Sequence, residues 1–127
     1  MGNVKSHKDL KVWQESMDLV IQIYKLVENF PKHEIYGLSS QIRRAAVSIP
    51  SNIAEGAGRK GENEFTRFLY IALGSLSEVE TQLEISHRLG YIKDIEVINS
   101  SIYFIRNMLA NLIKSLKWTG LYNHVTL

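Results

Sequence analysis

Hydrophobic residues recur along most of the chain at intervals of three and four positions, a spacing typical of helices packed in a bundle. Four such segments lie at about residues 9–29, 38–57, 63–89 and 94–117, and stretches containing glycine or proline separate them. The pattern predicts an all-α fold in which these four helices pack as a bundle. We expect the 127 residues to form a single domain.

The first segment carries two hydrophobic rows. We assign the seam of the bundle to the row that steps by about 3.5 residues, namely Leu10, Trp13, Met17, Val20, Tyr24 and Val27. The second row lies about 100° further around the helix and comprises Val12, Leu19, Ile23, Leu26 and Phe30. A helix in a monomeric bundle needs one such stripe. The excess predicts a deeply central helix or one that another subunit also covers.

The second segment contains Pro50, which lacks an amide donor and crowds the carbonyl of Ala46, so we expect a kink there. A polar stripe runs beside its core row, and its members are Gln41, Arg44, Ser48, Ser51, Asn52 and Glu55. The stripe either faces solvent or lies in an interface. Short serine and asparagine side chains are unusual on a free helix surface. We therefore assign Ser48, Asn52 and Glu55 to a helix or subunit interface.

The third and fourth segments have regular seams with one irregularity each. Gly74 lies in the middle of the third segment, where glycine is unfavourable unless a neighbour packs closely, so we expect another helix to approach it. In the fourth segment we expect Gly120 to end the helix.

Three stretches resemble a known family. They read LKVW from Leu10, YGLSSQIRRAAVSIPSNIAEGAGR from Tyr36 and EFTRFLYIALGSLSEVETQL from Glu64. They resemble the four-helix-bundle family encoded in intervening sequences of bacterial large-subunit ribosomal RNA genes. That family is similar to the accessory variability protein of diversity-generating retroelements, a basic barrel that binds nucleic acid and a reverse transcriptase. The resemblance implies an antiparallel up-down four-helix bundle assembled as a ring-shaped homopentamer.

Composition narrows the functional classes. The chain has 45% hydrophobic and 22% charged residues, a net charge of +2 and no cysteine, which excludes disulfides and thiolate metal sites. The N-terminus does not resemble a secretory signal, and no apolar run approaches the roughly 20 residues that span a bilayer. We expect a cytoplasmic protein with no membrane contact.

Catalytic chemistry has little support in the sequence. The four histidines lie in separate parts of the chain, so we expect no metal site and no cofactor. Glu55 is the one carboxylate in a distinctive setting, and a lone glutamate near arginines is more often structural than a general base. We expect no enzymatic activity.

Basic residues form the candidate ligand site, because they can contact phosphate groups. An oligomer would repeat these contacts in every copy. The first candidates are Arg43, Arg44, Arg59 and Lys60, followed by Arg106, Lys114 and Lys117. The competing interpretation is that Arg43 and Arg44 form salt bridges within the bundle or between subunits, with Glu55 as one partner. The leading hypothesis is a non-enzymatic homo-oligomer that binds RNA or other nucleic acid through backbone phosphates. The alternative is a scaffold that recruits a protein partner.

Overall fold

Four helices account for most of the chain. The computed structural model describes the backbone of residues 6–126 and the side chains of residues 6–117. The long helices are α1 (Lys11–Val27), α2 (Leu38–Ala57), α3 (Glu62–Arg88) and α4 (Glu96–Thr126), and the 3-10 turns are η1 (His7–Asp9) and η2 (Lys32–Glu34). Residues 6–126 contain no strand. The predicted all-α class with four helices is confirmed.

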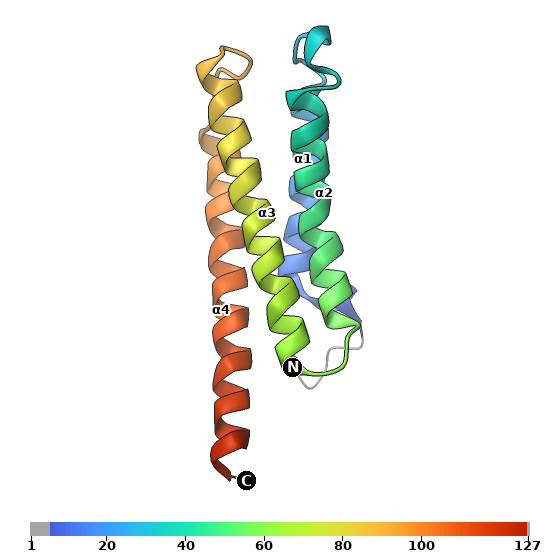
Figure 1. Ribbon diagram of the computed structural model, residues 1–127. Coiled ribbons are helices and arrows are strands. Elements are labelled where there is room, and N and C mark those ends of the chain that lie inside the picture. Colours follow the sequence, from blue (N-terminus) through green and yellow to red (C-terminus); the bar gives the residue numbers. More distant parts are fainter. Residues whose placement is uncertain (1–5, 127) are drawn as a thin grey trace.

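The helices lie alongside one another (Figure 1). The α1–α2 and α3–α4 connections lie at one end, and the α2–α3 connection lies at the other (Figure 1). Each helix contacts two others: α1 packs against α2 and α4, and α3 packs against α2 and α4, with the most extensive contact between α2 and α3. No helix of the described part is long and apolar enough to cross a membrane.

The core is built from the predicted seams of three helices. The predicted apolar row of α3 is buried at every position, from Phe65 to Leu83. The central residues of the predicted apolar rows of α2 and α4 are buried as well. These rows contribute Ile42, Ile49 and Ile53 from α2, and Ile102, Ile105 and Leu109 from α4. A period near 3.5 therefore located the buried faces of these helices.

The seam assigned to α1 is wrong. Leu19 and Ile23 of the second row are fully buried, whereas Met17 and Tyr24 of the first row are 39% and 43% exposed. Both rows have nearly the same period, so spacing alone does not decide which one faces inward. Packing against α2 and α4 covers the second row. Leu10 and Val27 at the two ends of the first row are buried, so Met17 and Tyr24 are the members of this row that lie exposed on the surface.

Two further expectations concern helix continuity. Gly120 does not end α4, which continues to Thr126. A single interior glycine costs about 1 kcal/mol, which is too little to stop a long helix. Pro50 lies within α2, where its side chain is buried, and helical structure continues on both sides of it. The kink at Pro50 stays a prediction.

Close approach of α2 and α3 is sharpest at Gly56. A Cβ atom built on Gly56 would lie 2.6 Å from Cβ of Phe68 and 3.1 Å from Cδ1 of Phe65. Only a residue without a side chain fits there. Gly74, for which we expected the same explanation, differs, because no described atom lies within 4 Å of its built Cβ. Helix packing within this chain therefore does not account for Gly74.

A polar contact joins the two connections at the other end. Glu34 accepts a hydrogen bond from the backbone N–H of Leu38 at 3.1 Å and another from the hydroxyl of Tyr91 at 2.9 Å. These two bonds, the backbone bond first, lower the pKa of Glu34. The pKa of Tyr91 is raised, chiefly because its hydroxyl donates to the Glu34 carboxylate. Glu34 thus caps α2 and ties it to the α3–α4 connection.

Candidate nucleic-acid interface

Basic side chains gather where α2 gives way to α3. Arg59 follows α2, and its guanidinium lies 5.4 Å from the ring centroid of Phe68, while that of Arg67 lies 4.5 Å from the same ring. Lys60 is adjacent in sequence and exposed. Phe68 itself is buried. The two guanidiniums are therefore held at the surface by a ring anchored in the bundle, and each is also paired with a glutamate, Arg59 with Glu55 at 2.7 Å and Arg67 with Glu64 at 3.2 Å.

Helix α4 adds a second pair of cations. The Lys117 ammonium donates a hydrogen bond of 2.7 Å to the hydroxyl of Tyr70 on α3 and lies 5.1 Å from the ring centroid. Lys114 lies three positions earlier, on the same side of α4, and is exposed. Tyr70 in turn is three positions from Arg67 on α3. We call the resulting surface the basic end, and it consists of Arg59, Lys60, Arg67, Lys114 and Lys117.

The sequence located four of these five residues but missed Arg67 and the neighbouring tyrosine. Arg67 is also paired with Glu64 at 3.2 Å, so it resembles an ordinary charge on a solvated helix. What distinguishes it is its contact with Phe68, which depends on how α2 and α3 meet. The i,i+3 spacing of Arg67 and Tyr70 was the available signal. An exposed tyrosine among cations also supplies the aromatic surface that the sequence reasoning did not find.

Arg43 and Arg44 lie elsewhere on the bundle. They precede Arg59 by about 15 positions, which places them roughly 22 Å away along α2 at 1.5 Å per residue. The Arg43 guanidinium lies 5.9 Å from the ring centroid of Tyr24 on α1. Arg44 is exposed and has no ion pair among the described residues. The predicted bridge between these arginines and Glu55 is absent there, because Glu55 pairs with Arg59 at 2.7 Å.

Arg106 has an acidic partner on another helix. Its guanidinium makes two hydrogen bonds to the carboxylate of Glu80 on α3, at 2.8 and 3.4 Å. The pair joins α4 to α3 and neutralises the Arg106 charge. A guanidinium engaged at both ends of a carboxylate has fewer donors left for phosphate than an exposed lysine.

Ser48 and Asn52 of the polar stripe lie at the contact between α2 and α3. The Ser48 hydroxyl is 2.8 Å from that of Ser75 on α3. The Asn52 amide donates to the Ser48 carbonyl at 2.8 Å and to its hydroxyl at 2.9 Å. The three side chains satisfy one another where the helices are too close for larger groups. Glu55 is exposed and pairs within α2's own C-terminal turn.

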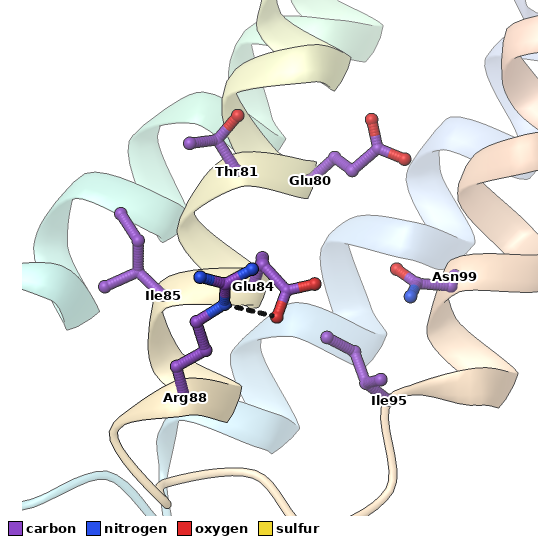
Figure 2. Close-up of a pocket in the computed structure, with 7 residues that line it drawn as sticks. All are labelled: Glu80, Thr81, Glu84, Ile85, Arg88, Ile95 and Asn99. Carbon is purple, nitrogen blue, oxygen red and sulfur yellow. Dashed lines mark hydrogen bonds and ion pairs between the residues drawn. The ribbon is translucent and has the colours of Figure 1, made fainter.

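The opposite half of α3 carries acidic residues. A cleft of about 410 Å³ lies between α3 and α4. Figure 2 shows the residues that line it, among them Glu80 and Glu84 on α3 and Asn99 on α4. The guanidinium of Arg88 lies 3.3 Å from the Glu84 carboxylate (Figure 2). Both glutamates of the cleft are therefore paired with arginines, Glu84 with Arg88 and Glu80 with Arg106. In the parts of the chain whose side chains are described, no group of three or more histidine or acidic side chains could hold a metal ion.

The described part of the chain is thus an all-α protein of four packed helices with basic side chains grouped at one end. Residues 8–111 match the family of the 23S rRNA-intervening sequence protein, and the chain belongs to that family. Among solved structures, it is similar to a Bacteroides thetaiotaomicron protein of unknown function from the S23 ribosomal protein family. The two are 31% identical with a TM-score of 0.73, over 81% of this chain and 98% of the other. No curated protein matches the chain.

Proposed function

We propose that the protein is a non-enzymatic helical-bundle module that binds RNA or other nucleic acid through backbone phosphates at its basic end. The observation that carries the proposal is the grouping of five cations from two helices and a connecting loop. Phosphate contacts supply most of the affinity of sequence-independent nucleic-acid binding. Tyr70, with its ring exposed beside Lys117, adds a surface on which an unpaired base can stack.

The proposed scaffold is a homo-oligomer of up-down antiparallel bundles in the cytoplasm. Its support is the alternation of connections between the two ends (Figure 1) and the exposed apolar row of α1. A pentamer is the number that the family resemblance implies. A bend of α2 at Pro50 belongs to the same proposal, since proline removes a backbone donor there.

The test is the binding of generic RNA and duplex DNA across a salt series. We expect log K to fall linearly with log salt, with a slope of about 0.7 to 0.9 per phosphate contacted. Charge reversal of Arg59 and Lys60 together should lower this slope by about 2 and leave the circular dichroism spectrum unchanged. The matched control reverses Arg88 and Lys93, which changes the net charge equally at the other end of the bundle. Absence of binding at low salt would rule out the proposal.

A protein-interaction scaffold is the second candidate, because several large apolar side chains are exposed. Tyr36 is 94% exposed in the α1–α2 connection, and Val97 is 72% exposed at the start of α4. Exposed apolar residues of this size are typical of contact surfaces. Absence of RNA and DNA binding by the wild type even at low salt would favour this candidate, because a protein scaffold needs no phosphate contacts.

A further inference from the structure

Two surfaces on the sides of the described bundle are open to solvent, a line of apolar side chains on α1 and a shallow groove along α3. The first is a ridge on α1 formed by Met17, Ile21 and Tyr24, which are spaced by four and three positions and are 39%, 53% and 43% exposed. This spacing places them along one line of the helix. Three large apolar side chains in a line are the pattern by which one helix docks into a groove of another molecule.

The second surface is a groove of about 720 Å³ along the outer side of α3, next to α2. It is lined by Gln41 of α2 and by Ile71, Gly74, Glu78, Gln82 and Ile85 of α3. Gly74 forms its floor, because a Cβ built there meets no described atom within 4 Å. Glycine is poorly suited to a helix interior, and nothing within the described bundle requires it here. A helix approaching from outside would require it.

Gln82 provides an independent indication that the groove is occupied. Its side chain is only 7% exposed, yet its Oε1 atom has no hydrogen-bond partner in the described structure. A buried polar atom without a partner is rare in a native protein. Gln82 lines the groove, so a side chain entering the groove can meet its amide group.

We propose that the α1 ridge of one copy of this chain docks into the α2/α3 groove of a second copy. The proposal rests on the homo-oligomer of the proposed function and specifies which surfaces meet. Ile71 precedes Gly74 by three positions on α3, where it can meet the apolar ridge. The open position at Gly74 admits the bulk of Ile21.

Charges flanking the two surfaces fix the orientation. Along α1, Asp18 precedes Lys25, and both are exposed. Along α3, Arg67 precedes Glu78. With α1 parallel to the neighbour's α3, aspartate faces arginine and lysine faces glutamate. The antiparallel orientation sets like charges against each other. The two spacings, seven and eleven residues, differ by about 6 Å along a helix, which arginine and lysine side chains can bridge.

The resulting assembly is head to tail. Within one copy, α1 and α3 run in the same direction (Figure 1). Parallel docking therefore leaves successive copies pointing the same way. The ridge and the groove are different surfaces, and α1 makes no contact with α3 in the described bundle. Such a heterologous contact either closes into a ring or continues as a filament, and it does not stop at a two-fold dimer.

The decisive experiment mixes two variants, each with one surface disabled. Ile21→Glu disables the ridge, and Gly74→Leu fills the groove at a position where an added Cβ atom meets no described atom within 4 Å. By analytical ultracentrifugation we expect each variant alone to self-associate roughly tenfold to 100-fold more weakly than the wild type. An equimolar mixture should form a dimer and no larger species, because each pair has one intact ridge facing one intact groove.

Controls separate failure of this interface from failure of the proposed function. Ala110→Leu, at an exposed position of α4, should assemble like the wild type. Circular dichroism checks the fold of every variant. A wild type that is monomeric at micromolar concentration would refute oligomerisation itself, while RNA binding is measured separately. An oligomeric wild type whose two variants also assemble normally, or whose mixture stays monomeric, would overturn the ridge-and-groove contact alone. Capture of another protein by the groove of a monomer would overturn it as well.

Discussion

The contact between α2 and α3 makes a quantitative prediction at Gly56. Substitution by alanine places a Cβ atom 2.6 Å from Cβ of Phe68, which is held close to the α3 backbone and cannot swing away. Overpacking of this kind costs about 1–3 kcal/mol. The gain in helix propensity offsets at most about 1 kcal/mol, and less in a last turn. We expect Gly56→Ala to destabilise the fold by about 1–2 kcal/mol.

Gly58 offers a matched control two positions away. It has φ −84° and ψ −9°, which alanine also adopts, and the nearest atom to its built Cβ is a backbone oxygen at 3.6 Å. Gly58→Ala should stabilise the protein by about 0.4–1 kcal/mol, because it restricts the unfolded chain. The two variants thus differ by about 2 kcal/mol. With an m-value of about 2 kcal/mol/M in urea, their midpoints should lie roughly 1 M apart.

The assay is urea unfolding followed by circular dichroism at several protein concentrations. The concentration series is needed because self-association adds stability that depends on protein concentration. If Gly56→Ala and Gly58→Ala unfold at the same midpoint, α2 and α3 do not approach each other as closely as described. A lower midpoint for Gly58→Ala than for Gly56→Ala would refute the reasoning outright.

Two further predictions concern charged contacts. Replacing Arg106 by alanine should lower the free energy of unfolding by up to about 1 kcal/mol, because its pair with Glu80 is only partly buried. Urea unfolding measures this loss. RNA affinity should stay within about twofold of the wild type, and a larger loss would show that Arg106 belongs to the ligand site. The lowered pKa of Glu34 makes the stability of the protein depend on pH. Above pH 4.5, the ordinary pKa of this group, the charged carboxylate stabilises the fold. This contribution is lost as the pH falls through the lower pKa of the folded state. The difference in urea midpoint between the wild type and Glu34→Gln should therefore be constant from pH 5 to 8, within the range where this carboxylate is charged, and shrink below about pH 4.5. A constant difference down to pH 3 would contradict this account.

Periodicity predicted the fold where a helix offers one apolar row. The seam of α3 and the centres of the α2 and α4 rows are buried as expected. In α1 two rows compete, and the structure buries Leu19 and Ile23 rather than Met17 and Tyr24. The competition is decided by contacts with α2 and α4, which lie far away in sequence. A pattern read along one helix contains no information about them.

The candidate site was predictable to a similar degree. Arg59 and Lys60 were recognisable because they follow the end of a helix, where side chains extend from the bundle. The engagement of Arg106 by Glu80 was not, since the two residues are 26 positions apart. Gly74 shows the same limit, because the expected close approach of a helix has no partner within the described chain. A helix from a second molecule would explain Gly74, and this residue therefore supports the proposed self-association.

Head-to-tail assembly and nucleic-acid binding use neighbouring parts of the molecule that share only Arg67, and each makes the other more effective. The ridge and the groove lie along α1 and α3, whereas Arg59 and Lys60 lie at the connection between α2 and α3. Copies that all point the same way present their basic ends on one face of the assembly. A phosphate backbone bound by one copy is then held near the next at a high effective concentration. A small net charge of +2 per chain is therefore compatible with strong binding, provided that the copies are aligned. A two-fold dimer with opposed ends would lose this advantage.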